Sequence, residues 1–208
     1  LARRGARVRM QSRVRGIAVA GGVASGLQLA DGETVALGAG DAVIVAVPPA
    51  AASALVPEVR APRASRAIVN AHFRLTQAFT GPAMMGLIGG HGHWVFFRGD
   101  VASVTVSAAD AMIDRPAADL AALFWPEICR VLGSPPAPLP PVRIIKEKRA
   151  TFAQTPEELA RRPGCRTPCR NLFLAGDWTD TGLPATLEGS VRSGNTAAEA
   201  ALRITAAT

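Results

Sequence analysis

Apolar and polar residues alternate in short runs through residues 7–37, and pairs of turn-forming residues interrupt the runs. Alternation with a period of two is typical of strands that have one buried face. The dipeptides Gly21–Gly22 and Asp31–Gly32 separate the runs and favour hairpin turns, so the pattern predicts an antiparallel meander of three strands. Residues 41–49, DAVIVAVPP, form a continuous apolar run, which predicts a parallel strand buried on both faces. A short helix is expected to follow over residues 50–57.

A different pattern occupies the middle of the chain. Residues 115–133 place apolar side chains at helical spacing, with Pro116 near the start and Gly133 after the end, and this predicts a helix. Pro126 lies inside the helix and is expected to kink it or divide it into two. Segments rich in β-branched and aromatic residues predict four strands, at residues 66–75, 93–99, 101–110 and 142–153.

The last part of the chain returns to an α/β pattern. Residues 171–176, NLFLAG, predict a second buried strand, and residues 185–204 predict a long helix. The two ends of the chain therefore look like parts of one α/β domain with a different domain inserted between them. We expect the α/β domain to comprise residues 1–57 and 165–208, and the insert to comprise residues 58–164.

Composition narrows the class of protein. Apolar residues make up 49% of the chain, which is enough for a folded core. The net charge of +7 comes from scattered arginines with little aromatic interleaving, so we expect no nucleic-acid partner and leave open an attraction to anionic lipid headgroups. No apolar stretch reaches the 18 or so residues of a membrane span. Because three cysteines fit a reducing compartment, the expectation is a cytoplasmic protein, with peripheral association at the inner face of the membrane. The spacing of CRTPC and HGH predicts no metal site.

The C-terminal strand, loop and helix carry the most specific chemistry. The strand ends at Gly176, whose lack of a side chain would let a ligand approach the backbone. Asp177 follows as a carboxylate at the strand tip, suited to accept hydrogen bonds from the hydroxyls of a sugar or ribityl chain. An ordinary strand–loop–helix connection, in which Asp177 is only a turn residue, is an alternative explanation of the same pattern. The helix begins near Thr186. Its first turn would offer electronegative ligands three backbone N–H groups, those of Leu187, Glu188 and Gly189.

The stretch LFLAGDWTDTGLPATLEGSVRSG resembles the C-terminal flavin-binding signature of the amine oxidase and phytoene desaturase superfamily. In that superfamily the Gly-Asp step contacts the ribityl and pyrophosphate part of FAD, and the start of the last helix faces the pyrimidine edge of the isoalloxazine. The resemblance implies FAD as cofactor and a Rossmann-like FAD/NAD(P)-binding fold, α/β plus α+β, with a β-meander and an inserted substrate domain. It places an adenine contact at Val14. The other implied cofactor contacts are Gly176, Asp177, Thr186, Leu187 and Glu188.

Four stretches, IVNAHFRL, SAADAMIDRP, KEKRATFAQTPE and GDWTDTGLPATLEG, together resemble the squalene-associated branch of the superfamily, the hydroxysqualene dehydroxylases of hopanoid biosynthesis. The resemblance implies an FAD-dependent oxidoreductase that replaces the allylic hydroxyl of hydroxysqualene, an isoprenoid lipid, with hydrogen to form squalene. Asp180, in the loop between the two sets of flavin contacts, is the candidate acid. Candidate residues for an apolar substrate tunnel are Phe73, Phe79, Met84, Met85, Trp94, Phe96 and Phe97.

One motif of the superfamily is missing from the sequence. The G-x-G-x-x-G turn that binds the FAD pyrophosphate occurs nowhere, and GAGDAV at residues 38–43 lacks the third glycine and precedes a strand. Because the chain starts at Leu1 with no signal-peptide pattern, we expect it to be the C-terminal portion of a larger enzyme, without the N-terminal βαβ unit and in need of that segment as a partner. Two alternatives stay open. One is a carotenoid (phytoene-type) desaturase or another flavoenzyme of the amine oxidase family, and the other is a truncated, non-catalytic fragment unable to bind FAD alone.

Overall fold

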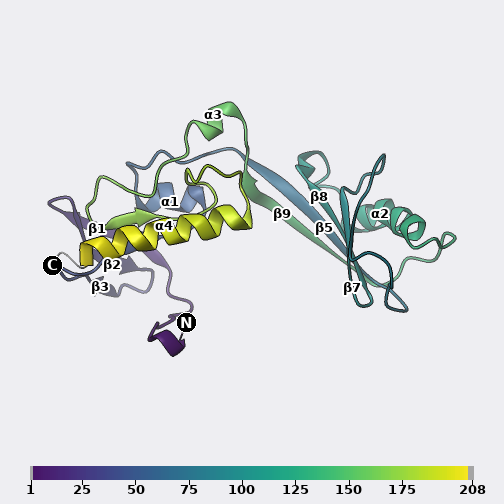
Figure 1. Cartoon of the computed structure of the whole chain (residues 1–208), viewed down its shortest axis with the longest axis horizontal. Coiled ribbons are helices and arrows are strands. Elements are labelled where there is room, and N and C mark those ends of the chain that lie inside the picture. The colour runs from purple at the N-terminus through teal and green to yellow at the C-terminus, as the bar shows by residue number, and fades with distance from the viewer. Residues whose placement is uncertain (1, 206–208) are drawn as a thin grey trace. The chain divides into compact units, whose positions relative to one another are not determined.

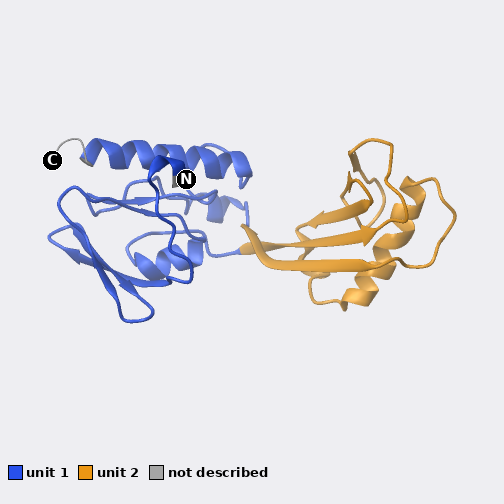
Figure 2. Cartoon of the chain, turned by 90° about the horizontal axis from the view of Figure 1, so that it is seen from below, with its two compact units in different colours: residues 1–64, 152–208 blue, residues 65–151 orange. Residues whose placement is uncertain are grey.

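Two segments at opposite ends of the sequence, residues 1–64 and 152–208, fold together into one unit, and residues 65–151 form a second unit (Figure 2). The structure is a computed structural model and describes residues 2–205. The predicted ranges also included Leu1 and residues 206–208, which lie outside the described residues.

The insert is shorter than the predicted 58–164, because the residues on both sides of it bond to each other within the first unit. The backbone N–H of Ala153 donates to the carbonyl oxygen of Ala64 at 2.8 Å, and the Nε–H of Arg161 donates to that of Ala61 at 3.0 Å. The assignment of the two units to cofactor and substrate stays a prediction.

The predicted meander is confirmed. It consists of three antiparallel strands, β1 (Val14–Ala20), β2 (Val23–Leu29) and β3 (Thr34–Ala36). Gly21 and Gly22 make the β1–β2 turn with positive φ angles, which glycine adopts without strain. The arginine-rich residues 7–13 lie outside the strands, after the 3-10 helix η1 (Ala2–Arg4).

The two continuous apolar runs form a parallel pair, made of β4 (Val43–Val45) and β10 (Leu172–Leu174). Leu174 packs on the side of the pair that is covered by α1 (Pro49–Leu55). Phe173 points the other way and packs against α4 (Leu187–Thr205), which runs along the opposite side in Figure 1. Both faces of β10 are therefore covered, as its uninterrupted apolar pattern predicts. β4 differs from the expectation, because Val45 is buried whereas Ile44, on the other face, is 40% exposed.

Asn171 joins the meander to the parallel pair. Its side chain is 3% exposed. Oδ1 accepts a hydrogen bond from the backbone N–H of Ala24 at 2.7 Å, while Nδ2 donates to the carbonyl oxygens of Ala24 and Asp41, each at 3.0 Å. The buried amide is thus satisfied by backbone groups from two other segments, and it fixes the start of β10 against the meander.

The second unit is built on a sheet with the strand order β6-β7-β8-β5-β9. Its strands are β5 (Ser65–Arg74), β6 (Met84–Gly86), β7 (Trp94–Arg98), β8 (Val101–Ser107) and β9 (Val142–Phe152). The four predicted strands are confirmed, and β6 is an additional strand of three residues. A 3-10 helix, η2 (Ala109–Ala111), follows β8. The helix α2 (Ala117–Val131) covers one face of the sheet (Figure 1).

Of the two expected effects of Pro126, a kink or a division of α2, the division does not occur. The helix continues through the proline from Ala117 to Val131. Proline lacks an N–H, which leaves one turn of the helix without its hydrogen bond. Phe124 and Ile128, on either side of Pro126, are both fully buried in the same core, so packing on the sheet stabilises the helix on both sides of the proline.

A short helix that the apolar pattern did not predict, α3 (Pro156–Leu159), follows β9. Thr155 Oγ1 accepts a hydrogen bond from the backbone N–H of Glu158 at 3.4 Å. The order Thr, Pro, Glu, Glu is a capping-box signature with proline at the first helical position, and this signal could have revealed the helix.

Candidate functional site

Trp178 holds the carboxyl end of β10 to the segment that follows β4. Its indole is 1% exposed, and its Nε1–H donates to the carbonyl oxygen of Val47 at 2.9 Å. The indole also occupies the space beside Gly176, where a Cβ would lie 2.7 Å from Trp178 Cδ1 and closer still to Nε1. The φ of Gly176 is 145°, which L residues rarely adopt. The missing side chain at Gly176 therefore makes room for the protein's own tryptophan, a reason that the sequence did not indicate.

Asp177 lies half-buried directly after Gly176, at the end of the buried strand. Burial raises the pKa of its carboxyl above the ordinary value of 3.8, although the backbone N–H groups of Asp177 and Trp178 and the charge of Arg162 all act to lower it. A desolvated carboxylate costs stability in the free protein. Its place at the carboxyl end of a parallel strand, where open α/β sheets bind ligands, makes it a candidate binding group.

Arg162 holds the loop that carries Asp177. Its Nη2 donates to the carbonyl oxygen of Asp177 at 3.1 Å, to the carbonyl oxygen of Thr179, and to Thr181 Oγ1 at 3.4 Å. The guanidinium carbon lies 5.4 Å from the centroid of the Phe152 ring. Its Nε is buried and has no hydrogen-bond partner among residues 2–205. One side chain thus fixes three positions of the loop, and sequence reasoning missed it because no local pattern marks a contact between segments 15 to 19 residues apart.

The first turn of α4 is capped by the protein itself. Thr186 Oγ1 accepts a hydrogen bond from the backbone N–H of Gly189 at 3.0 Å, and the Thr186 carbonyl oxygen accepts one from Ser190 N–H at 3.0 Å. The expectation that the Gly189 N–H is open to a ligand is therefore wrong, because the cap uses it. The side chains of Leu187, which is 88% exposed, and Glu188 both point to solvent at this helix end.

The loop after Asp177 comes back onto the start of α4. A Cβ on Gly189 would lie 3.0 Å from the Pro184 carbonyl oxygen and 3.7 Å from Thr181 Oγ1. Thr181 is the residue whose hydroxyl accepts a hydrogen bond from Arg162. The structure therefore connects the strand end at Asp177 to the helix start through a single ordered loop.

Two other predicted site residues have roles in local structure. Asp180 is exposed; its backbone N–H donates to the Pro163 carbonyl oxygen at 2.8 Å, and its Oδ1 accepts from Gly182 N–H at 3.4 Å. This is the geometry of a side chain that shapes a turn. Val14 begins β1 and pairs with the last residue of β2. Among the hydrogen bonds of the described residues, none joins the Asp180 side chain to Asp177.

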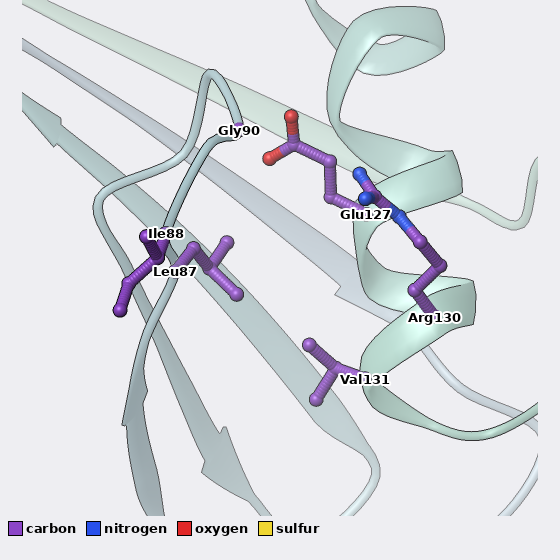
Figure 3. Close-up of a pocket in the computed structure, with 6 residues that line it drawn as sticks. All are labelled: Leu87, Ile88, Gly90, Glu127, Arg130 and Val131. Carbon is purple, nitrogen blue, oxygen red and sulfur yellow. The ribbon is translucent and has the colours of Figure 1, made fainter.

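A hollow of about 180 Å³ in the second unit lies between α2 and the glycine-rich loop of residues 87–93 (Figure 3). Glu127 points from α2 towards this loop and is only 4% exposed. Its Oε1 accepts hydrogen bonds from the His91 backbone N–H at 2.6 Å and from His91 Nδ1 at 3.2 Å, and its Oε2 accepts from Gly92 N–H at 2.9 Å. A Cβ at Gly90 would lie 2.9 Å from Glu127 Oε1, so the loop needs glycine to approach the carboxylate. The carboxylate of this hollow is therefore already used to fix the loop.

We expect Glu127→Gln to lower the free energy of unfolding by about 1–3 kcal/mol, because the amide presents N–H donors where the loop also presents N–H groups. Urea unfolding and amide hydrogen exchange at His91 and Gly92 measure the change. The exposed Glu147→Gln on β9 is the control and should shift stability by less than about 0.5 kcal/mol. Equal effects of the two variants would contradict a structural role for the buried carboxylate.

The predicted tunnel residues divide between the two faces of the sheet. Phe73 and Phe97 are 0% and 7% exposed and belong to the core under α2, so they are not free to line a tunnel. Met84 and Trp94 are 54% and 44% exposed. Neighbouring strand residues point to opposite faces, and the sequence alone did not indicate which set α2 would cover.

The described residues contain no helix that is long and apolar enough to cross a membrane. Between Ala2 and Thr205, the structure also brings together no group of three or more His, Cys, Asp or Glu side chains that could hold a metal ion.

The family of flavin containing amine oxidoreductases matches residues 1–202, and the chain belongs to this family. Over 202 residues it is 50% identical to the hydroxysqualene dehydroxylase of Rhodopseudomonas palustris and 47% identical to that of Sinorhizobium fredii; both matches cover 97% of this chain and 48% of the relative. The chain therefore spans about half the length of the curated relatives it matches.

Solved structures agree on the fold. A putative protoporphyrinogen oxidase from Exiguobacterium superposes with a TM-score of 0.66 at 15% identity, covering 94% of this chain and 47% of that protein. The expected mixed α/β flavoprotein fold is confirmed at this level, and the family implies a flavin.

Proposed function

We propose that this chain supplies part of an FAD site at the carboxyl ends of β4 and β10. Two observations support the fit. The Asp177 carboxylate is desolvated and would gain hydrogen bonds from ribityl hydroxyls, and the neighbouring Arg162 has a buried Nε that lacks an acceptor. A bound group rich in hydroxyl and carbonyl oxygens would satisfy both.

The proposed contacts extend from the meander to the last helix. The backbone of Gly176 would lie beside the cofactor, and the backbone of Val14 would contact the adenine. The positive end of the α4 dipole would favour the electronegative pyrimidine edge. The residues at that helix start are Thr186, Leu187 and Glu188. The pyrophosphate would be held by a G-x-G-x-x-G segment from outside these 208 residues, since the sequence contains no such motif.

For the whole protein we propose the reductive dehydroxylation of hydroxysqualene to squalene. The observation that carries this proposal is the 50% identity to a hydroxysqualene dehydroxylase along nearly the full length of this chain. In the reaction a carbon–oxygen bond breaks, a carbon–hydrogen bond forms at the same carbon, and the hydroxyl leaves as water after it gains a proton. Reduced FAD, when bound, supplies the hydride.

The residues of this chain would bind and orient the substrate and would protonate its leaving hydroxyl. Asp180 is the proposed proton donor to the leaving hydroxyl, because it lies on the loop between the two sets of proposed flavin contacts; it would act there in its protonated form. Met84 and Trp94 offer exposed apolar surface to an isoprenoid chain. Exclusion of water by apolar side chains would protect a cation-like carbon from attack.

We expect Asp177→Asn to weaken FAD retention by the holoenzyme and to change the pH dependence of stability. Because burial raises the pKa of Asp177, the folded protein holds this proton more tightly than the unfolded chain does. The ionised carboxylate therefore opposes folding, and its cost grows as pH rises from the ordinary value of 3.8 through the raised pKa. As pH rises from 3.8 through the raised pKa, Asp177→Asn should therefore lose less stability than the wild type does.

Urea unfolding between pH 3.5 and 7, together with FAD titration, measures both effects of Asp177→Asn. Glu199→Gln, an exposed carboxylate-to-amide change on α4, is the control and should alter neither. Wild-type FAD affinity in Asp177→Asn would remove this residue from the proposed site.

Turnover tests the reaction. We expect the holoenzyme, with reduced FAD, to convert hydroxysqualene to squalene detectable by mass spectrometry. Conversion of phytoene with no product from hydroxysqualene would replace our proposal with a carotenoid desaturase. A folded chain that takes up no FAD by itself would favour a fragment without independent activity.

A further inference from the structure

A second hollow, of about 850 Å³, lies in the first unit beside the amino end of β10. Its wall is formed by the β1–β2 turn, the segment before β10 and the last turn of α4. The lining residues that carry charge or apolar surface are Val23, Arg166, Arg170, Phe173, Arg203 and Ile204.

This hollow is separate from the proposed flavin contacts. Val23 lies at the turn end of the β1–β2 hairpin, whereas Val14 lies at the opposite end of β1. Asn171 lines the hollow just before β10, whereas Asp177 follows the end of that strand. The hollow and the flavin contacts therefore lie at opposite ends of the same strands.

The hollow is strongly basic. Arg166, Arg170 and Arg203 all line it, and none of them forms an ion pair within the described part of the chain. No Asp or Glu is found among the described residues that line it. The carboxyl end of α4 contributes about half a negative charge, which three full positive charges exceed.

The backbone around the arginines is ordered. Arg170 N–H donates to the Gly22 carbonyl oxygen at 2.9 Å, which ties the segment before β10 to the hairpin turn. The Arg166 guanidinium lies 5.9 Å from the centroid of the Phe173 ring, a cation–π arrangement. Arginine in such a setting keeps its planar donors available for bidentate contacts to phosphate oxygens.

Apolar groups share the same wall. Val23 and Ile204, which are both partly exposed, line the hollow together with the arginines, so it suits a ligand with an anionic end and an apolar body. A small inorganic anion would use only the arginines and leave this apolar wall in water.

We propose that this hollow binds the phosphate headgroup of an anionic phospholipid, and so places the first unit at a membrane surface. The site is independent of the flavin and of the substrate. It also gives a specific location to the basic character of the chain, which composition alone leaves distributed over the surface.

Vesicle co-sedimentation of the full chain tests the proposal, with phosphatidylglycerol vesicles as the probe and phosphatidylcholine vesicles as the neutral comparison. The test variant is Arg166→Gln/Arg170→Gln/Arg203→Gln. The control variant is Arg98→Gln/Arg143→Gln/Arg149→Gln, which removes three exposed arginines of the second unit. Both variants remove the same charge, so only the location differs, and circular dichroism checks that each is folded.

We expect phosphatidylglycerol binding to fall at least about tenfold in the test variant and less than about twofold in the control, because each arginine near an anionic surface contributes roughly a fivefold factor. Equal losses in the two variants would show general charge attraction and overturn the site, and so would an absence of binding to phosphatidylglycerol. A titration with glycerol phosphate separates the sources of phosphate. Binding of this soluble compound without vesicle binding would overturn the lipid assignment.

Discussion

Gly176→Ala is expected to lower the free energy of unfolding by about 3–5 kcal/mol and to abolish flavin retention. The new Cβ would lie 2.7 Å from Trp178 Cδ1, in a backbone conformation with a φ of 145°. Strained backbone and overpacking each cost about 1–3 kcal/mol, and here they coincide. The indole cannot retreat easily, since it is fully buried and bonded to Val47. Urea unfolding measures the loss, and flavin absorbance after gel filtration measures retention.

Gly194→Ala is the matched control for this prediction. A Cβ at Gly194 meets no atom within 4 Å, and the residue lies inside α4. The same chemical change should therefore stabilise the protein by about 0.5–1 kcal/mol through helix propensity. Adding Trp178→Leu to Gly176→Ala should restore part of the lost stability by removing the steric conflict. If Gly176→Ala unfolds at the wild-type urea concentration, the packing of Trp178 under this glycine is not as described.

Arg162→Met is expected to weaken FAD binding about 10- to 100-fold. Methionine keeps an unbranched side chain beside Phe152, but it removes the guanidinium that lies over the Phe152 ring and donates to Asp177, Thr179 and Thr181. Hydrogen bonds from a charged donor contribute about 1.5–3 kcal/mol, so the loss of the set should loosen the loop that presents Asp177. Arg162 acts as a positioning residue in this prediction. FAD titration measures affinity, and amide hydrogen exchange of residues 177–181 measures the order of the loop.

Arg161→Met provides the comparison at the next position in the chain. Arg161 is also partly buried, but its Nε donates to the carbonyl oxygen of Ala61 and faces Glu158 rather than the loop of residues 177–181. This variant should lose stability while FAD affinity and the exchange of residues 177–181 stay as in the wild type. Similar loss of FAD affinity in both variants would mean that Arg162 acts only through overall stability. Partial recovery by Arg162→Lys would support the need for a positive donor at this position.

The elements of the fold were largely predictable because their patterns are local. Alternation over residues 7–37, the apolar run at 41–49 and the helical spacing at 115–133 predicted elements of the observed type. Pro126 did not divide α2, because the cost of a proline to a helix is intrinsic, whereas the burial of Phe124 and Ile128 that offsets this cost depends on the sheet beneath. The predicted insert, 58–164, is longer than the observed one, 65–151, for a similar reason, because hydrogen bonds between distant segments decide where it begins and ends.

By itself the sequence determined the meander, the parallel strands, the long last helix and the family, since these follow from residue spacing and from the motif at the end of the chain. Only the tertiary structure decided that Gly176 accommodates Trp178, that Arg162 holds the loop of Asp177, and that Arg166, Arg170 and Arg203 gather at one hollow. The contacts of Arg162 and the cluster of arginines join segments that are apart in the sequence, and the place of the Trp178 indole depends on its burial and on its hydrogen bond to Val47. Local propensity is encoded within a few residues, whereas desolvation, steric fit and charge clustering depend on which segments meet in space.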